Sequence, residues 1–281
     1  MNELKKLLEI FELEPIEQNI FRGVSYDLGF PNLFGGQVLG QALIAAARTV
    51  EPERTAHSCH AYFLRPGDAR APIVYQVSCI RDGGSFTTRH ILAIQHGRPI
   101  FDMSASFQLP EEGFSHQDSM PPDVPPPEEL KTQQELHADS KGRLPDVLAV
   151  SRPVEIRPVP PSRGEKAAAA ARHWFRSIEP MPDDPRMHQA LLAYASDFEL
   201  LATSLLPHDV SLMDGNVFVA SLDHALWIHR PFRVDDWLLY DRHSPNACNG
   251  RGLNWGKVYA RDGRLVASVA QEALIRKRKG K

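Results

Sequence analysis

The sequence has 281 residues, 42% hydrophobic and 24% charged, so it can bury a substantial core as one large domain or two smaller ones. A formal net charge of −3 gives no overall positive field, which argues against a nucleic-acid partner. No run of about 18 apolar residues is present, so we expect no membrane insertion. The three cysteines form no CxxC pair, which favours a reducing compartment, the cytoplasm.

The first elements in chain order are a helix and then several strands. Glycines open the predicted helix at residues 35–50 (GGQVLGQALIAAARTV). Strands are predicted within residues 57–68, 73–83 and 85–108, and the last range contains a hairpin turn at QHGR. A helix followed by antiparallel strands is typical of an α+β unit.

A proline-rich segment divides the chain. Eleven of the 23 prolines lie between Pro110 and Pro161, including the run PPDVPPP at Pro121–Pro127. Proline has no backbone donor and disfavours regular structure, so we expect a linker at residues 113–151, with a short helix near 127–136. The linker would join an N-terminal domain, residues 1–112, to a C-terminal domain, residues 152–281.

The second half repeats the first. Tyr-Phe-Leu-Arg-Pro at 62–66 corresponds to Trp-Ile-His-Arg-Pro at 227–231, and the hairpin Gly97-Arg98 corresponds to Gly263-Arg264. A predicted helix again precedes predicted strands. The sequence therefore predicts the α+β class, with two copies of one long helix covered by an antiparallel sheet.

The second predicted helix contains a misplaced acid. Apolar side chains recur at steps of three and four, which predicts one continuous amphipathic helix with the buried positions Met187, Leu191, Tyr194, Phe198, Leu201 and Leu205. Asp197 falls on that apolar face. A buried carboxylate is costly unless polar groups meet it, so we favour a functional acid. The alternative is a helix that restarts at Ser196, where Ser196 and Glu199 have capping-box spacing.

Two further polar residues interrupt apolar strand faces. If residues 217–227 form one strand, Ser221 lies on a face with Val217, Val219 and Trp227, and Asp223 falls on the same face. Gln271 is the polar member of an otherwise apolar face that runs from Leu265 to Ile275. An acid, a hydroxyl and an amide from three elements could satisfy one another and hold a water molecule.

Long blocks of the sequence resemble the acyl-CoA thioesterase II family of double-hotdog enzymes. The resemblance runs from about Phe21 to Arg276 and is carried by FGGQVLGQAL, HSCHAYFLRPGD, RDGGSFTTRH, HQALLAYASDFELL, SLDHALWIHRPF, DDWLLY and DGRLVASVAQEALIR. It implies two fused hotdog domains and hydrolysis of fatty acyl-CoA. It also implies catalysis by an Asp, a Ser or Thr, and a Gln, which in this chain are Asp197, Ser221 and Gln271.

In the mechanism we expect, Asp197 is the general base that activates water, and Ser221 and Gln271 orient it. When the two halves are aligned, Leu43 stands at the position that corresponds to Asp197. The first half therefore has no acid there, and we expect one competent site per chain. The resemblance implies no cofactor besides the CoA of the substrate, and a homodimer or homotetramer.

Two interpretations stay open for the glycine-rich helix start. Close approach of a bound substrate would make Gly35, Gly36 and Gln37 substrate-binding residues, whereas tight helix packing explains the glycines alone. We expect no metal, because in a strand His57 and Cys59 would face one side and His60 the other.

Three functions fit these residues. A thioester hydrolase is favoured. A hotdog enoyl-CoA hydratase or dehydratase usually pairs a His with an acid, whereas the acid here is grouped with a Gln. A non-catalytic acyl-CoA-binding module would not need a carboxylate that faces the core.

Overall fold

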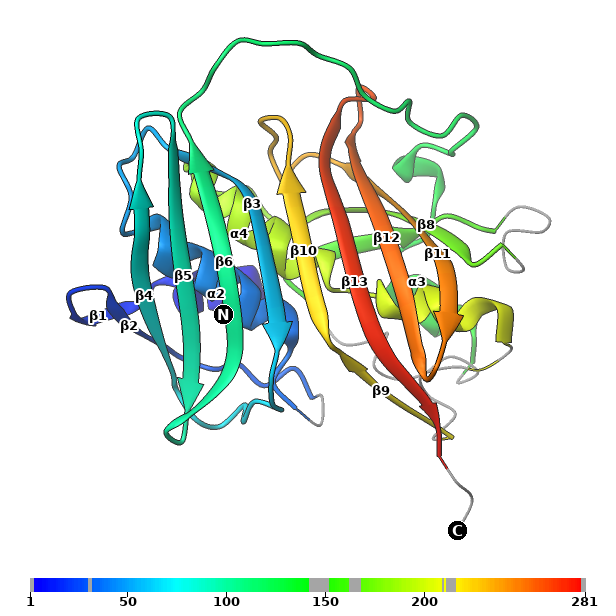
Figure 1. Cartoon of the computed structure of the whole chain (residues 1–281). Helices are drawn as coiled ribbons and strands as arrows, with labels where there is room; N and C mark the ends of the chain where they lie inside the picture. Colours follow the sequence, from blue (N-terminus) through cyan, green and yellow to red (C-terminus); the bar gives the residue numbers. More distant parts are fainter. Residues whose placement is uncertain are drawn as a thin grey trace.

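Antiparallel strands from both halves of the chain form one continuous sheet in the computed structural model, which describes residues 3–29, 32–141, 152–161, 168–208, 210 and 216–278 (Figure 1). The strand order is β1-β2-β4-β5-β6-β3-β10-β13-β12-β11-β8-β7, with β9 also paired to β13. The two helices α2 and α4 lie side by side on one face of this sheet. The α+β class predicted from the sequence is confirmed.

In the N-terminal half, one long buried helix follows two short strands in the chain and precedes four longer ones. Its elements are α1 (Glu3–Phe11), β1 (Glu14–Glu17), β2 (Ile20–Gly23), α2 (Gly35–Ala47), β3 (Thr55–Phe63), β4 (Ile73–Asp82), β5 (Phe86–Gln95) and β6 (Arg98–Gln108).

The C-terminal half repeats this order after two short helices. Those helices are η1 (Pro127–Glu129) and α3 (Gln133–Asp139), close to the short helix predicted at 127–136. The later elements are β7 (Val154–Pro158), β8 (Ala170–Ser177), α4 (Pro185–Ser196), η3 (Leu201–His208), β9 (Val217–Ser221), β10 (Asp223–Ile228), β11 (Leu238–Cys248), β12 (Arg251–Ala260) and β13 (Leu265–Lys277). Residues 142–151 of the predicted linker lie outside the described residues.

The two halves meet at β3 and β10, which pair antiparallel with His60 opposite Ala225. These strands carry corresponding segments of the repeat, so the sheet continues from one half into the other with an approximate two-fold relation. The pairing satisfies the backbone groups that each half would otherwise leave exposed at a sheet edge.

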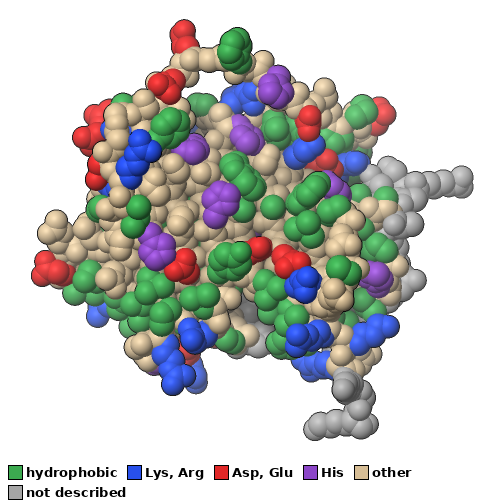
Figure 2. Space-filling view, in the orientation of Figure 1, with side chains coloured by type: hydrophobic (Ala, Val, Ile, Leu, Met, Phe, Trp, Pro, Cys, Tyr) green, Lys and Arg blue, Asp and Glu red, His purple; other side chains and the backbone are tan. Residues whose placement is uncertain are grey.

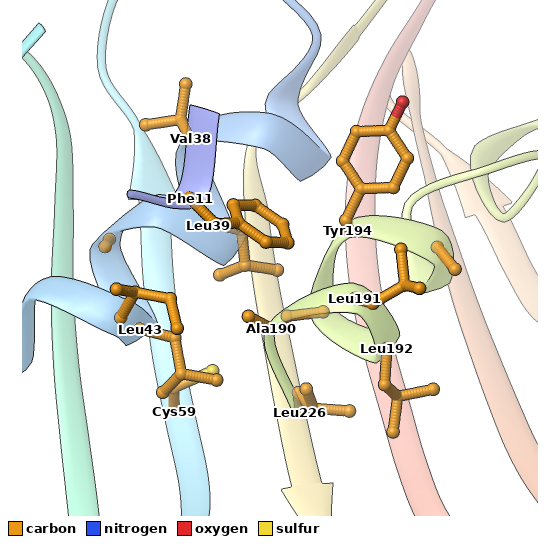
Figure 3. Close-up of a cluster of buried hydrophobic side chains, with 14 of the residues drawn as sticks. Phe11, Val38, Leu39, Leu43, Cys59, Ala190, Leu191, Leu192, Tyr194 and Leu226 are labelled. Carbon is orange, nitrogen blue, oxygen red and sulfur yellow. The ribbon is translucent and has the colours of Figure 1, made fainter. Parts of the chain in front are cut away.

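The core lies where α2 and α4 pack against each other. Every residue of α2 after Gly35 is buried, which is the pattern of a helix covered on all sides. Figure 3 shows Leu39 and Leu43 of α2 beside Ala190 and Leu191 of α4, with Cys59 of β3 and Leu226 of β10 among the same cluster. The helices run antiparallel, because the start of α2 approaches the end of α4.

The proline-rich segment covers part of the other face of the C-terminal sheet. Met120, Val124 and Leu130 pack on a cluster that contains Trp174 and Trp237. Prolines lack N–H groups, so this segment contributes carbonyl oxygens instead: Trp174 Nε1 donates to the Pro125 carbonyl at 2.9 Å, and Arg157 donates to that of Pro127. The segment is thus fixed by side-chain donors of the domain that it covers.

Within the described residues, no helix combines the length and apolar character needed to cross a membrane.

Candidate active site

Asp197 lies just past the end of α4. The continuous helix predicted from Met187 to Leu205 is wrong, because α4 ends at Ser196 and Asp197 is its C-terminal cap residue. The predicted restart at Ser196 is also absent: Glu199 takes a left-handed conformation (φ 60°), which breaks the helix before η3 begins at Leu201. The apolar spacing in the sequence extends beyond the end of α4 because Phe198 and Leu205 are buried in the core although they lie outside that helix. The predicted burial of Asp197 is confirmed, at 7% exposure.

The N-terminus of α2 faces the Asp197 carboxylate. The backbone N–H of Gly36 donates to Asp197 Oδ2 at 2.9 Å. Phe34, the N-cap of α2, has no side chain that can cap, so Asp197 satisfies a donor that the helix start leaves open. The positive end of the helix dipole stabilises a carboxylate at this place. The N-terminal half therefore completes the surroundings of an acid that belongs to the C-terminal half.

Gly35 and Gly36 permit this approach. A Cβ on Gly35 would lie 2.9 Å from Asp197 Oδ2, and one on Gly36 would lie 2.4 Å from the Tyr194 carbonyl oxygen. Both distances are too short for any side chain, so the glycines let the two helix ends come together. The Gln37 side chain is buried; its Oε1 accepts from the Tyr26 N–H and its Nε2 donates to the Val24 carbonyl.

Gln271 connects the predicted residues. It lies on the inner face of β13 with 0% exposure. Its Nε2 donates to Asp197 Oδ1 at 2.7 Å and to Ser221 Oγ at 3.1 Å. The acid, hydroxyl and amide predicted from three separate segments thus lie in one hydrogen-bonded cluster. Leu265 does not share this face as predicted, because a register shift near the start of β13 turns it to the opposite side, against Trp237.

A break in the strand places Ser221. The single strand predicted through residues 217–227 is wrong: β9 ends at Ser221, and β10 begins at Asp223. Between them the Leu222 N–H donates to the Glu272 carbonyl, and the alternation of faces shifts by one residue. Ser221 keeps the predicted inward face, but Asp223 does not.

Because of this shift, His224 rather than Asp223 faces inward. His224 has 0% exposure, with Nδ1 3.3 Å from Gln271 Nε2 and 3.9 Å from Asp197 Oδ1. Sequence reasoning missed it, since regular alternation puts it on the opposite face. Asp223 and His224 are neighbours in β10, so their side chains point to opposite faces of the sheet.

The N-terminal half has an apolar counterpart of this cluster. The repeat places Ala56, Cys59 and Ala105 where the C-terminal half has Ser221, His224 and Gln271. The sheet register supports this match. Ala56 lies opposite Phe107 and Ser221 lies opposite Ala273, and Phe107 and Ala273 occupy corresponding positions of the repeat. At the end of α2 the cap residue is Arg48, and Asp197 caps α4. The helix ends therefore match Arg48, rather than the predicted Leu43, with Asp197. Neither Arg48 nor Leu43 is an acid, so the N-terminal half has no counterpart of the Asp197 carboxylate.

A second buried polar cluster lies behind the turn that follows Asp197. The Glu199 carboxylate accepts from Arg242 at 3.2 Å and from Gln133 of α3, and it lies 3.3 Å from His173 Nδ1. Although burial opposes ionisation, the His173 and Arg242 contacts hold the pKa of Glu199 well below its usual range. Burial lowers the pKa of His173 to about 4. The cluster fixes the turn to β8, β11 and α3.

The His57–His60 segment also departs from strict alternation. A bulge between Ala56 and Ser58 turns His57 outward, where it contacts Ser106 Oγ at 2.8 Å, and Cys59 is buried inside. His57 and Cys59 therefore lie on opposite faces, contrary to the prediction. Across the described part of the chain, no group of three His, Cys, Asp or Glu residues is arranged to hold a metal ion.

Comparisons with known proteins agree with this architecture. A family model described as acyl-CoA thioesterase matches residues 144–274, and one described as acyl-CoA thioesterase N-terminal domain matches residues 27–108. Acyl-CoA thioesterase 2 of Haemophilus influenzae is 42% identical over 280 residues, 97% of this chain and 98% of that protein. Human acyl-coenzyme A thioesterase 8 is also 42% identical, over 95% of this chain and 88% of its own length.

Solved structures show the same relation. The acyl-CoA thioesterase II TesB2 from Mycobacterium marinum is 44% identical, with a TM-score of 0.83 over 98% of this chain and all of that one. A hot dog fold protein from Alicyclobacillus acidocaldarius, 20% identical with a TM-score of 0.80 over 98% of this chain and 99% of its own, shares the fold. The chain belongs to the acyl-CoA thioesterase family, and its two halves are tandem hotdog domains, as the resemblance implied.

Replacement of Gly36 by alanine tests the close helix contact. The added Cβ would lie 2.4 Å from the Tyr194 carbonyl oxygen, so α2 must move away from α4. We expect Gly36→Ala to lower the free energy of unfolding by about 1–3 kcal/mol in urea titrations. A Cβ on Gly84 would meet no other part of the chain within 4 Å, so Gly84→Ala should change this free energy by less than about 0.5 kcal/mol. Equal effects of the two substitutions would contradict this geometry.

Lowering the pH tests whether His173 is buried in its neutral form. The pKa of His173 is about 4 in the folded chain and about 6.5 when unfolded, so below pH 6.5 the unfolded state binds more protons. The stabilisation from neutral His173 is therefore complete above pH 6.5 and is lost as pH falls toward 4, by up to about 1.4 kcal/mol per pH unit. In urea titrations from pH 7 to 5, His173→Gln should show a shallower loss of stability than the parent chain. Identical slopes would show that His173 is not buried in its neutral form.

Proposed function

We propose that the chain hydrolyses fatty acyl-CoA to a free fatty acid and CoA, with Asp197 as the general base. The observation that supports this most directly is the buried carboxylate, which one hydrogen bond ties to Gly36 and another to Gln271. A carboxylate held at 7% exposure by donors from both halves is oriented for chemistry in a way that a surface acid is not. Membership in the acyl-CoA thioesterase family supplies the substrate class.

The proposed reaction assigns separate tasks to the three residues. Asp197 removes a proton from a water molecule while the water oxygen attacks the thioester carbonyl carbon, and collapse of the tetrahedral intermediate releases the CoA thiolate. Ser221 accepts a hydrogen bond from Gln271, so its own hydrogen can be donated to the water or the substrate. Gln271 fixes the carboxylate and the hydroxyl relative to each other.

The positive end of α2 is the best candidate to stabilise the oxyanion. Gln271 Nε2 directs its hydrogens to Asp197 and Ser221, so its amide is occupied with positioning. The start of α2 supplies the positive end of the helix dipole beside the carboxylate. Gly35 and Gly36 leave no side chain between that helix end and the carboxylate. We therefore propose that Gly35 and Gly36 lie near the substrate. The Gln37 side chain instead holds the backbone at Val24 and Tyr26.

Other interpretations of the site have weaker support. In one, Asp197 attacks the thioester itself and forms a mixed anhydride. In the second, the chain is an enoyl-CoA hydratase or dehydratase: a dehydratase domain of PpsC, solved with C12:1-CoA, shares the fold at 12% identity and a TM-score of 0.54, which shows the fold alone. The third is a non-catalytic acyl-CoA binder.

We also propose that the chain acts in the cytoplasm as a homodimer or homotetramer, with domains at 1–112 and 152–281 and a linker at 113–151. The uncovered outer face of the sheet supports assembly: Tyr62 and Trp227 lie exposed on it near the seam, and Trp255 is exposed on β12. Figure 2 shows histidine and hydrophobic side chains spread over this face. Light scattering on a size-exclusion column should give two or four times the 31.5 kDa chain mass. A monomer at micromolar concentration, or a chain recovered outside the cytoplasm, would contradict these proposals.

Asp197→Asn tests the proposed base. We expect kcat for acyl-CoA hydrolysis, followed by thiol release, to fall by at least about 100-fold while the chain stays folded. Ser221→Ala and Gln271→Ala should lose less, because they orient rather than accept the proton. Asp102→Asn is the matched control, since Asp102 is partly exposed and its carboxylate contacts only His90 among the described side-chain pairs.

Near-normal turnover by Asp197→Asn would refute the assignment of the base. No thiol release with any acyl-CoA from the parent chain would favour the binding module, and hydration of an enoyl-CoA would favour the hydratase. A single turnover in ¹⁸O-water separates the two hydrolytic routes: label that enters the protein carboxylate would identify direct attack by Asp197 instead of attack by water.

A further inference from the structure

His224 is a buried titratable group whose Nδ1 lies 3.9 Å from Asp197 Oδ1. It lies on the inner face of β10 with 0% exposure, and its ring reaches both Gln271 and Ser196. On the other side of Gln271, Asn254 of β12 is directly opposite in the sheet register and is also fully buried. Gln271 is thus flanked by polar side chains on both neighbouring strands, on a face that is otherwise apolar.

The hydrogen bonds of Ser196 fix the tautomer of His224. Ser196 Oγ donates its one hydrogen to the Ala193 carbonyl at 2.9 Å. It must therefore act as acceptor for His224 Nε2, which lies 2.9 Å away, so Nε2 carries the imidazole hydrogen. Burial lowers the pKa of His224, so the ring is neutral at neutral pH. Nδ1 then has a free lone pair and faces Gln271 Nε2 at 3.3 Å.

The surroundings of the Gln271 amide permit one orientation. Three acceptors surround Nε2: Asp197 Oδ1 at 2.7 Å, Ser221 Oγ at 3.1 Å and His224 Nδ1 at 3.3 Å. A rotation of the amide by 180° would place Oε1 against a carboxylate and a nitrogen lone pair, which is repulsive. Without the Nδ1 lone pair, one of these two repulsions disappears and the amide can rotate away from Asp197.

We infer that His224 is a positioning residue, which fixes the Gln271 amide so that its N–H groups hold Asp197 and Ser221 in place. The inference rests on the proposed function, because it concerns the same site. His224 acts through Gln271 and does not itself remove the proton from water. The competing explanation is structural: His224 would only tie β10 to the end of α4 through Ser196.

Two substitutions separate positioning from structure. In His224→Asn, the side-chain oxygen can take the place of Nδ1, but the side chain is too short to reach Ser196. In His224→Gln, the longer side chain can reach Ser196 but leaves no acceptor at the Nδ1 position. Positioning therefore predicts that His224→Gln has the higher Tm and the lower kcat of the two. If kcat and Tm rank the two variants in the same order, His224 is structural and the inference is wrong.

A double-mutant cycle tests the route through Gln271. We expect His224→Gln to lower kcat by about tenfold in the parent chain, with KM within about threefold, and by less than about threefold in the Gln271→Ala background. The same fold-loss in both backgrounds would show that His224 acts independently of Gln271 and would overturn the inference. His60→Gln is the control, since His60 lies exposed on the opposite face of β3, next to β10.

A readout that does not depend on activity completes the test. Nitrogen-15 NMR of the histidine rings, with the His224 signal identified by its loss in His224→Gln, should show the hydrogen on Nε2 and an unprotonated Nδ1. A hydrogen on Nδ1 would overturn the inference. Failure of the proposed function is distinguishable, because Asp197→Asn would then retain activity whatever the tautomer of His224.

Discussion

The hydrogen bond from the Gly36 N–H to Asp197 Oδ2 is the contact on which the site depends. It joins the start of α2 to the residue that ends α4, and these helices come from different halves of the chain. A carboxylate at 7% exposure is tolerated only when donors replace water, and here a helix N-terminus and the Gln271 amide do so. The antiparallel packing of the two helices is therefore what allows an acid to be buried at this point.

The repeat explains why the polar cluster exists once. Both halves have the same helix and strand order, and the sheet crosses the seam at β3 and β10. In the N-terminal half, however, Ala56 and Ala105 stand where the C-terminal half has Ser221 and Gln271. Those small apolar residues pack the core, so one half supplies stability and a helix N-terminus while the other supplies the chemistry. Neither half could form the Asp197 environment alone.

Much of this arrangement could be predicted from residue types and spacing, because burial leaves a periodic signal. Ser221 and Gln271 were found as polar residues on apolar faces, and Asp197 as an acid among core positions. Local backbone irregularities could not be predicted. The left-handed turn at Glu199 ends α4, and the break at Leu222 reverses the alternation so that His224 faces inward. Both depend on tertiary partners, Arg242 for Glu199 and the β13 backbone for Leu222, which have no local signature.

A crystal structure of the chain with a non-hydrolysable thioether analogue of an acyl-CoA would test the central claim most directly. The account predicts that the carbon equivalent to the thioester carbonyl lies beside Asp197, with a water molecule between that carbon and the carboxylate, and that the Gly36 and Gln271 hydrogen bonds persist. An acyl group bound at the apolar Ala56–Ala105 counterpart, or an Asp197 carboxylate turned away from both donors, would contradict it.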